Sequence, residues 1–571
     1  MIEMQVDGRT VEAKEGDTIL AALRQEGIHV PTLCHMEGLL PSGSCRMCIV
    51  ELEGAPTFVP ACSYPVAAGM KIQTNSPRVL DARRTIVELL LSNHPDDCLY
   101  CTRSGKCDLQ SLAQKMGIRQ RLYRGRRIEQ EKDVSGPIVR DPDKCILCGR
   151  CVRVCEEIQS VGAIDFVNRG SRTFVGTAFG QGLNVSSCIN CGQCIVSCPT
   201  GALSEKSYVD DVVAVLADPN KFVVVQHAPA VSVSLAEEFG MAPGQDVDGK
   251  MVAALRRIGF DRVFDTSFTA DLTIMEEASE LAQRISNGGA LPMFTSCSPG
   301  WIKFMEQFYP DYLPNLSTCK SPQQMMGAIV KSYFAEREKL DPAGIVSVSI
   351  MPCTAKKFES NRPEMAKEHI PDVDYVLTTR ELGKLLHMFG IDLPAMPPQT
   401  ADTPFGERST AGKIFGASGG VMEAAVRTAH FLLTGQEAAQ LDVQAVRGLK
   451  GVKEVRANIG GLEVGAAVVS GLGNARTLLE EIRSGRKDLH FIEVMTCPGG
   501  CINGGGQPIG ADLDAARARM QALYKIDQSE KVRVSHKNPY VTRLYEEYLG
   551  KPLGERSHQH LHTHYGSRDT L

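Results

Sequence analysis

Cysteine is the reactive feature of this 571-residue chain: it has twenty, and ten of them lie in C-x2-C spacings. Thiolates at this spacing are soft ligands that suit zinc or iron–sulfur clusters. The remaining composition is ordinary, with a net charge of −5 and 23% charged residues, and it indicates neither a nucleic-acid partner nor an anionic membrane. Because we find no run of about 18 apolar residues and no secretory signal, we expect a cytoplasmic protein without disulfides or membrane insertion.

The first ligand set follows the pattern C-x10-C-x2-C-x13-C and consists of Cys34, Cys45, Cys48 and Cys62. Residues 41–48 (PSGSCRMC) are rich in small side chains, which let backbone N–H groups approach the sulfurs of a cluster. The pattern differs from the plant-type ferredoxin spacing. It resembles the [2Fe–2S] domain of hydrogenases and of the large iron–sulfur subunit of respiratory complex I. A structural zinc site is the alternative, although zinc sites usually contain two close pairs of ligands.

A helix-like segment at residues 83–92 leads to the second set, H-x3-C-x2-C-x5-C, formed by His94, Cys98, Cys101 and Cys107. We interpret the histidine as the fourth ligand of a [4Fe–4S] cluster, and zinc is again the alternative. Because imidazole is neutral, it makes the site less negative and tends to raise its reduction potential. The same signature occurs in the two families just named.

Two further runs have the bacterial ferredoxin spacing C-x2-C-x2-C-x3-C. They are Cys145, Cys148, Cys151 and Cys155, and then Cys188, Cys191, Cys194 and Cys198. In that fold the fourth cysteine of each run ligates the other cluster, so we expect Cys155 to join the second run and Cys198 the first. Fifteen cysteines and one histidine then make sixteen ligands for four clusters. Four clusters predict an electron-transfer chain that connects a redox site with an electron partner.

The elements that position the redox site are expected after about residue 210, where cysteine becomes sparse and α and β patterns alternate. Buried strands are predicted at residues 221–226 and 344–351. Helices are predicted at residues 234–238, 250–258, 272–286 and 382–389. This pattern favours an α/β domain with parallel strands and ligand-bearing loops at their ends.

Five cysteines remain in this part of the chain: Cys297, Cys319, Cys353, Cys497 and Cys501. We interpret Cys319 as a buried apolar side chain. The other four lie in three unusual loops, at residues 295–301 (TSCSPGW), 351–359 (MPCTAKKFE) and 493–508 (EVMTCPGGCINGGGQP). The last two loops follow strand-like runs, so we expect the three loops to converge at the mouth of one sheet. The glycines at 504–506 would let the backbone pack close to a cofactor.

These loops resemble the three signature motifs of [FeFe]-hydrogenases. Residues 317–324 (STCKSPQQ), 378–382 (TTREL) and 414–424 (IFGASGGVMEA) are similar to the family as well. The resemblance covers the whole chain, and the order of the N-terminal clusters matches the long members. It implies an H-cluster, in which a [4Fe–4S] cubane is bridged by a cysteine thiolate to a two-iron subcluster carrying CO, cyanide and azadithiolate. The implied reaction is 2 H⁺ + 2 e⁻ ⇌ H₂.

The resemblance also implies a domain order within a multidomain α/β protein. We expect a β-grasp [2Fe–2S] domain at residues 1–78 and a His/Cys-ligated [4Fe–4S] domain at residues 79–126. A two-cluster ferredoxin domain would occupy residues 127–209, and a two-lobed α/β catalytic domain residues 210–571.

The resemblance assigns roles around the H-cluster residue by residue. Cys353 and Cys497 match cubane ligands, and Cys501 matches the ligand that also bridges to the two-iron unit. Lys356 matches the lysine that contacts a cyanide, whereas by itself it would be a solvated surface lysine. The remaining pocket positions match Met351, Met495, Pro229, Ala230 and Phe415.

A proton path is implied through Cys297, Glu277, Ser317, Glu280 and Arg284. From the sequence alone, Glu276, Glu277 and Glu280 would instead be a solvated helix face, since buried carboxylates are costly without partners.

One position departs from the family pattern, because Ser298 stands where the first motif has a cubane-ligating cysteine. Serine is a poor iron ligand. Ser298 binds as an alkoxide, or an exogenous ligand completes the site, or Cys297 ligates after a loop shift while Ser298 lies near the proton relay. We favour the last reading. The histidine-rich segment 557–565 (SHQHLHTHY) is expected to be a surface tail.

Electrons would pass to ferredoxin or to a flavin- or NAD(P)-binding partner subunit, because this chain holds no convincing dinucleotide fingerprint. Maturation proteins are further expected partners. The alternatives are a sensory or regulatory hydrogenase-like protein and an electron-transfer subunit without hydrogen turnover.

Overall fold

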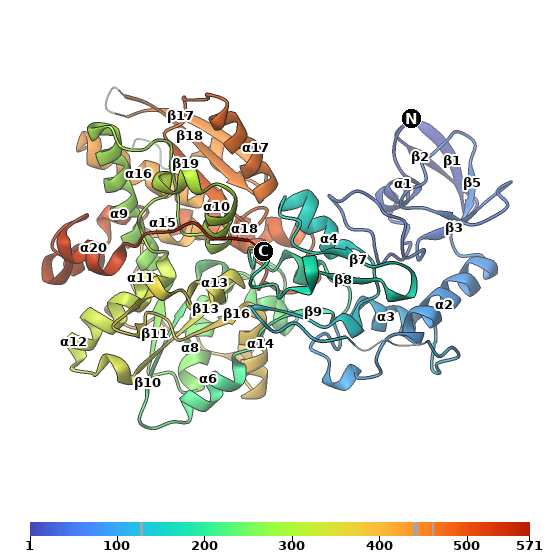
Figure 1. Cartoon of the computed structure of the whole chain (residues 1–571), viewed down its shortest axis with the longest axis horizontal. Helices are drawn as coiled ribbons and strands as arrows, with labels where there is room; N and C mark the ends of the chain where they lie inside the picture. The colour runs from blue at the N-terminus through green and yellow to red at the C-terminus, as the bar shows by residue number, and fades with distance from the viewer. Residues whose placement is uncertain (126–129, 438–442, 460–461, 571) are drawn as a thin grey trace. The chain divides into compact units, whose positions relative to one another are not determined.

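The computed structural model describes residues 1–125, 130–437, 443–459 and 462–570, and the chain forms two compact units (Figure 1). The first unit comprises Met1–Ile158, Gly162–Ser186 and Ser197–Ser204. The second comprises Gln159–Val161, Ser187–Val196 and Glu205–Leu571. The domain boundary expected at residue 126 lies outside the described residues. Among the described residues, no helix is long and apolar enough to cross a membrane.

The first unit begins with a five-stranded mixed sheet in the order β2-β1-β5-β3-β4. Its strands are β1 (Ile2–Val6), β2 (Arg9–Ala13), β3 (Ile49–Leu52), β4 (Val59–Pro60) and β5 (Lys71–Gln73). Met4, Val6, Val11 and Ala13 alternate with exposed residues, so one face of the sheet is buried. That face packs with helix α1 (Ile19–Gln25), and this core also holds Cys48 and Cys62.

Two helices follow in the first unit, α2 (Pro77–Ser92) and α3 (Asp108–Lys115). The hydroxyl of Ser76 caps α2 by accepting from the amide of Val79, and Pro77 occupies the first helical turn, where a missing N–H costs nothing. Both helices pack on residues from the 33–47 loop. The loops expected to hold the first two clusters therefore share one apolar core.

The second unit contains a parallel sheet in the order β11-β10-β13-β16. Its strands are β10 (Phe222–His227), β11 (Arg262–Asp265), β13 (Ile345–Met351) and β16 (Tyr375–Thr378). β10 and β13 confirm the two predicted strands to within one residue. Because the strands are parallel, their C-terminal ends and the loops that follow them lie along one edge.

Four predicted helices are confirmed in position. They are η6 (Leu235–Phe239), α8 (Asp248–Arg257), α9 (Thr266–Asn287) and α14 (Thr379–Met388), of which η6 is a 3₁₀ helix. Asp265 caps α9 by accepting from the amide of Ser267, and Gly288 ends it in the left-handed conformation. A reciprocal capping box between Thr378 and Glu381 starts α14. These caps anchor the helices at the edge where the β-strands end.

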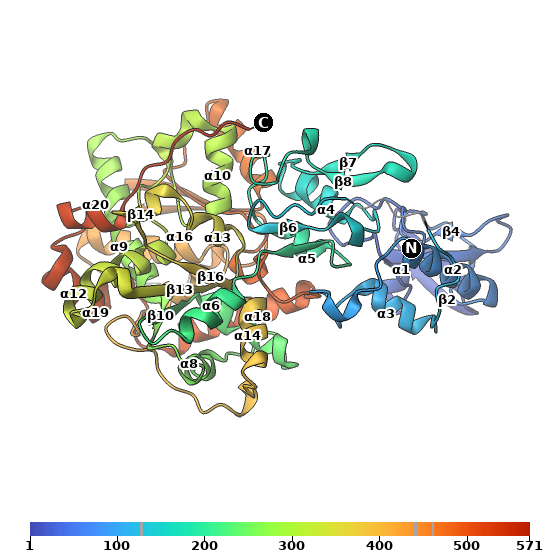
Figure 2. The ribbon, with the colours of Figure 1, turned by 60° about the horizontal axis from the view of Figure 1, so that its bottom comes forward.

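A second sheet of this unit has the order β12-β19-β18-β17 and is parallel except for the antiparallel pair β17–β18. Its strands are β12 (Met293–Phe294), β17 (Val452–Ile459), β18 (Leu462–Ser470) and β19 (Phe491–Met495). Figure 1 shows this sheet beside α17 (Leu472–Arg483), and Figures 1 and 2 show the first sheet with α6 (Val209–Leu216), α8 and α14. The long helix α9 packs against α16 (Gly420–Thr434) and α11 (Pro322–Ile329).

The C-terminal segment folds as α18 (Leu513–Ser529), α19 (Pro539–Leu544), the π-helical turn η16 (Tyr545–Leu549) and α20 (Glu555–Leu561). The expectation of a surface tail at residues 557–565 is wrong. Ser557 and Leu561 are fully buried and His562 is 8% exposed. The backbone explains this, because Lys320 donates to the carbonyl of Leu561 at 2.7 Å and Thr563 donates to that of Thr318 at 2.8 Å.

Candidate functional site

A buried pocket of the second unit gathers the residues that the three loops were expected to supply. The loops after β13 and β19 and the segment before α10 (Pro299–Phe308) line it together with the end of β10. It holds about 840 Å³ that protein atoms do not fill. All of the expected positions line it: Pro229, Ala230, Cys297, Ser298, Met351, Cys353, Lys356, Phe415, Met495, Cys497 and Cys501.

The pocket combines thiols with an apolar wall and a cation. Burial raises the pKa of the Cys501 thiol to about 12 and also raises the pKa of Cys353. Burial of this kind makes thiolates unfavourable unless positive charge compensates them. The ammonium of Lys356, 8% exposed, lies 3.1 Å from the carbonyl of Cys297 and 2.9 Å from Glu359 Oε2. The donor set therefore fits an iron–sulfur cofactor, whose metal ions would hold the thiols deprotonated.

The glycines at 504–506 pack against protein backbone. A Cβ on Gly504 would lie 2.0 Å from the carbonyl oxygen of Pro352, and one on Gly505 would lie 2.2 Å from that of Cys191. No side chain fits at these separations. The glycines therefore bring the loop of Cys501 against the loop of Cys353.

Cys297 and Ser298 have different surroundings. The hydroxyl of Ser298 lies 2.8 Å from the Thr496 hydroxyl and also accepts from the Thr496 amide at 3.4 Å. The Cys297 thiol is buried near Glu277 and Lys356, and burial raises its pKa. Ser298 thus faces the loop of Cys497, whereas Cys297 faces the carboxylates of α9.

Helix α9 buries all three of its central glutamates, so the solvated helix face does not form. Glu276 and Glu277 are fully buried and Glu280 is 6% exposed. Burial, with a further contribution from the charge of Glu280, raises the pKa of Glu277 to about 8. The Ser317 hydroxyl and the Ser296 amide act to lower this pKa, but burial outweighs them. Glu277 can therefore hold or release a proton near neutral pH.

Glu280 is the best-anchored member of the expected proton path. It receives hydrogen bonds from Arg284 Nη2 at 2.6 Å, from the Ser317 hydroxyl at 3.1 Å and from the Thr318 amide at 3.1 Å. Arg284 also donates to the carbonyl of Leu316 at 2.7 Å. Glu277, Glu280, Ser317 and Arg284 thus gather on one side of the pocket.

The sequence analysis missed the partners of Glu276. Its carboxylate accepts from Tyr545 and Ser557 hydroxyls, each at 2.5 Å, and from the Leu553 amide at 2.8 Å. His562 Nε2 lies 3.1 Å from the same carboxylate. Although burial acts to raise the pKa of Glu276, the hydrogen bonds from His562, Ser557 and Tyr545 hold it below its usual value. The alternating histidines of the tail were the only sequence signal of this arrangement.

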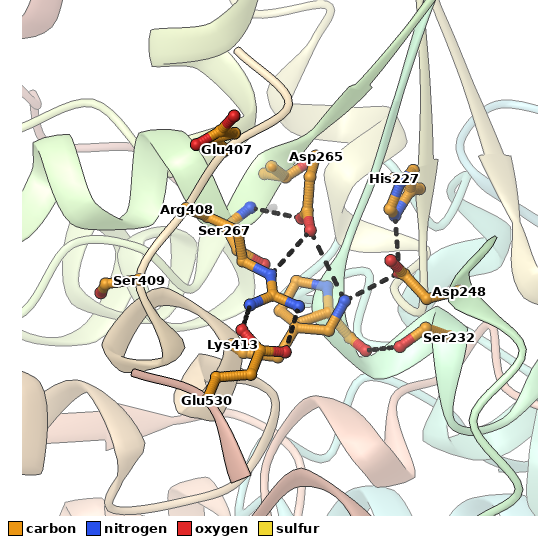
Figure 3. Close-up of polar contacts among 12 residues, drawn as sticks. His227, Ser232, Asp248, Asp265, Ser267, Glu407, Arg408, Ser409, Lys413 and Glu530 are labelled. Atoms are coloured by element: carbon orange, nitrogen blue, oxygen red, sulfur yellow. Dashed lines mark hydrogen bonds and ion pairs between the residues drawn. The ribbon is translucent and has the colours of Figure 1, made fainter. Parts of the chain in front are cut away.

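A second polar cluster lies at the C-terminal ends of β10 and β11. In the chain, β10 is followed directly by residues 228–230, which line the pocket. Figure 3 shows Lys413 between the carboxylates of Asp248 and Asp265, while Arg408 joins Asp265 to Glu530. The Lys413 ammonium is fully buried, 2.8 Å from Asp248 Oδ1 and 3.6 Å from Asp265 Oδ2. The ammonium therefore supplies, between these carboxylates, the positive charge that a metal ion could otherwise supply. The cluster therefore fixes the ends of β10 and β11 beside the pocket.

In the first unit, the structure brings the four ligands of the first expected cluster together. The Cys34 thiol lies within hydrogen-bonding reach of the Cys45 and Cys62 thiols, and Cys48 contacts Cys62 in the same way. The amide of Cys34 points at Cys45 Sγ at 3.3 Å. In the next set, a short 3₁₀ turn spans Cys98–Tyr100, and the Cys101 amide donates to the Cys98 carbonyl at 3.3 Å. His94 is buried, with Nδ1 3.0 Å from the Pro95 carbonyl.

Another cavity of the first unit is lined by Cys145, Cys148, Cys151 and Cys198. The fourth cysteine of the second ferredoxin run therefore lies with the first three of the first run. This grouping is the one expected from the ferredoxin pattern. The amide of Leu147 points at Cys145 Sγ at 3.4 Å.

Comparison with known families matches most of the chain. Residues 221–505 match "Iron only hydrogenase large subunit, C-terminal domain" and residues 513–568 match "Iron hydrogenase small subunit". Residues 1–77 match a 2Fe-2S iron-sulfur cluster binding domain and residues 144–202 a 4Fe-4S dicluster domain. Residues 83–121 match the NADH-ubiquinone oxidoreductase-G iron-sulfur binding region.

Individual relatives agree with these matches. The chain is 50% identical to NADP-reducing hydrogenase subunit HndD of Solidesulfovibrio fructosivorans, over 100% of both chains. It is 40% identical to iron hydrogenase 1 of Clostridium pasteurianum, over 98% of this chain and 99% of the other. A solved [FeFe]-hydrogenase HydA1 variant from Chlamydomonas reinhardtii is 41% identical with a TM-score of 0.58, covering 64% of this chain and 100% of that one.

Proposed function

The chain belongs to the [FeFe]-hydrogenase family, and from that premise we propose how its residues divide the work of hydrogen turnover. The reaction is the reversible conversion of H₂ into protons and electrons at an H-cluster, with [2Fe–2S] and [4Fe–4S] clusters carrying the electrons. The observation that carries the assignment of residues is the single pocket lined by all eleven expected positions.

Cys353, Cys497 and Cys501 would hold the cofactor, because they are the thiols of the two loops that the glycines press together. When bound, the H-cluster supplies the redox-active iron and the base at which hydrogen is split or formed. Lys356 contributes a positive charge suited to the anionic cyanide ligands. Pro229, Ala230, Met351, Phe415 and Met495 provide the apolar wall that excludes water.

Cys297 and Ser298 are the two candidates for the fourth cubane ligand. Two contacts support a proton-relay role for Cys297, namely its nearness to Glu277 and the Lys356 bond to its carbonyl. The bond between Ser298 and Thr496 places the serine beside the Cys497 loop, as a ligand position would require. The Ser298→Cys variant tests this, because a cubane that lacks a thiolate should change its electron paramagnetic resonance spectrum when the thiol is restored.

Glu277 would pass protons between the pocket and Glu280, with the Ser317 hydroxyl bonded to Glu280. Its pKa of about 8 makes both protonation states accessible at neutral pH. Arg284 holds Glu280 in place through a short ion pair. In this path Glu277 would exchange protons with the pocket, and Glu280, held by Arg284, would pass them on.

For the electrons, we propose delivery to a partner subunit that binds a flavin or NAD(P). The support is the 50% identity with a subunit of an NADP-reducing hydrogenase and the complex I-type match at residues 83–121. Ferredoxin is the alternative acceptor. Reduction of NADP⁺ by the complex, but not by this chain alone, would distinguish the two.

Infrared spectroscopy and hydrogen turnover of the matured protein test the assignment. Wild type should show CO and cyanide stretches, and Cys501→Ala should lose them. Glu277→Gln should keep the bands and lose turnover, roughly 100-fold or more. Ser279→Ala on the same helix, whose hydroxyl bonds only the Met275 carbonyl at 2.7 Å, is the matched control and should keep both. Full turnover in Glu277→Gln would refute the proton role.

A further inference from the structure

The expected proton path ends at Arg284, a residue that cannot exchange protons near neutral pH. A guanidinium stays protonated throughout the physiological range. Arg284 instead fixes Glu280 by a 2.6 Å ion pair and donates to the Leu316 carbonyl. A group that accepts the proton from Glu280 must therefore lie elsewhere around this carboxylate.

His562 is the titratable group that the fold places there. One of its ring nitrogens, a carboxylate oxygen of Glu280 and Cys319 Sγ all lie within 4.8 Å of one another. Thr318 holds both groups in place, because its amide donates to Glu280 at 3.1 Å and its hydroxyl lies 2.8 Å from His562 Nδ1. One hydroxyl group or one water spans such a gap.

The other face of the imidazole meets a charged carboxylate. His562 Nε2 lies 3.1 Å from Glu276 Oε2. The same carboxylate accepts hydrogen bonds from the hydroxyls of Tyr545 and Ser557 and from the amide of Leu553. A carboxylate that holds Nε2–H leaves Nδ1 as the acceptor and stabilises the imidazolium that forms. Glu276 therefore orients His562 and balances its charge, as Arg284 does for Glu280.

The imidazole also has a route outward. The His558 ring lies 4.3 Å from the His562 ring, centroid to centroid, and His558 is exposed whereas His562 is 8% exposed. The charged and titratable groups that face His562 are Glu276 and Glu280 from α9, Cys319 from the preceding loop and His558 from its own segment. Behind them, Tyr545 from η16 bonds Glu276, and His564 acts on His558.

We propose that His562 is a proton-carrying residue at the outer end of the path, linking Glu280, across the gap of at most 4.8 Å, to solvent at His558. This inference rests on the proton role of Glu280 in the proposed function. In the direction of H₂ oxidation, one proton leaves the carboxylic acid of Glu280 and binds His562 Nδ1. Glu280 is left as a carboxylate paired with Arg284, and the imidazolium is paired with Glu276. The proton then passes to His558 and from there to solvent, and His562 returns to the neutral form.

The test uses the matured full-length holoenzyme and the variant His562→Gln, which keeps a polar side chain but cannot carry a proton. The matched control is His560→Gln, because His560 is also buried on this segment but bonds the Tyr548 hydroxyl at 3.2 Å instead of a carboxylate. H₂ oxidation is measured with a dye acceptor across pH 5.5–9, in H₂O and in D₂O. Iron content and infrared bands report the integrity of the cofactor.

His562→Gln should lower turnover roughly tenfold or more, enlarge the solvent isotope effect and alter the pH dependence of the rate. Its iron content and infrared bands should stay those of wild type, and added imidazole should restore part of the rate in His562→Ala. His560→Gln should match wild type in every respect. Wild-type rates, pH profile and isotope effect in His562→Gln would overturn the proposal, as would an equal loss in His560→Gln.

A second variant decides the matter if His562→Gln does not fold. His558→Gln lies on the surface and should shift the pH profile in the same direction by a smaller factor. An unchanged profile there would overturn the outward route. Glu280→Gln separates this inference from the proposed function. If Glu280→Gln is inactive and His562→Gln is normal, only the histidine route fails, whereas an active Glu280→Gln refutes the path itself.

Discussion

Replacing Glu277 by glutamine should stabilise the catalytic unit while it stops proton transfer. The carboxyl is fully buried, and the hydrogen bonds from Ser317 and from the Ser296 amide do not offset its desolvation, so its ionised form is unfavourable in the folded state. Burial raises its pKa from the ordinary value of 4.5 to about 8. A group whose folded pKa is raised stabilises the protein fully below its unfolded pKa, and that contribution is lost as the pH rises through the folded pKa.

The magnitude follows from the width of this pH window. Each pH unit between the unfolded and the folded pKa changes the free energy of unfolding by about 1.4 kcal/mol. Between pH 5.5 and pH 8, Glu277→Gln should therefore gain about 3 kcal/mol over wild type. Below pH 4.5 the two proteins should differ only by the packing of an amide in place of a carboxylic acid.

Trp301, the only tryptophan, is fully buried in the same unit, so its fluorescence reports urea unfolding of that unit. The control is Glu276→Gln, since hydrogen bonds from His562, Ser557 and Tyr545 hold the pKa of Glu276 below its usual value. Its contribution is lost only as the pH falls through that lowered pKa, so Glu276→Gln should be destabilised by a constant amount across this window. A stability difference for Glu277→Gln that does not change with pH would refute the reasoning.

Three further substitutions test the framework around the site. Lys413→Met should destabilise the catalytic unit by about 3–5 kcal/mol, because it leaves the carboxylates of Asp248 and Asp265 without their buried cation; thermal unfolding measures this, and a loss below about 1 kcal/mol would contradict it. Gly504→Ala should lower the iron content of the pocket, since its Cβ would lie 2.0 Å from the Pro352 carbonyl; Gly344→Ala, with its nearest atom at 4.0 Å, is the control and should load normally. Cys198→Ala should remove the signal of one [4Fe–4S] cluster, whereas Cys319→Ala, in an apolar core, should remove none; an intact spectrum in Cys198→Ala would contradict the grouping in that cavity.

Local spacing was enough to identify the clusters and the family. A cluster ligand set is defined by residues a few positions apart, so the C-x2-C runs are visible without any fold. The strands β10 and β13 were also predictable, because continuous apolar runs between turn residues indicate buried parallel strands. The three cysteine loops were recognisable for the same reason.

The surroundings of each functional side chain depended on contacts between residues far apart in the chain. The charge state of Glu277 follows from its burial beside Glu280, which the amphipathic pattern of α9 did not reveal. The C-terminal histidines were mistaken for a surface tail, because only the backbone bonds to residues 318–320 carry them inside.

The sequence by itself determined which cofactors this protein binds and which family it belongs to, since ligand type and spacing are local properties. The tertiary structure alone decided which glutamates are buried, that Lys413 stands between two carboxylates, and that His562 meets Glu276 and lies near Glu280. The physical reason is that burial and pairing are set by packing between distant segments, and these control the protonation of each group.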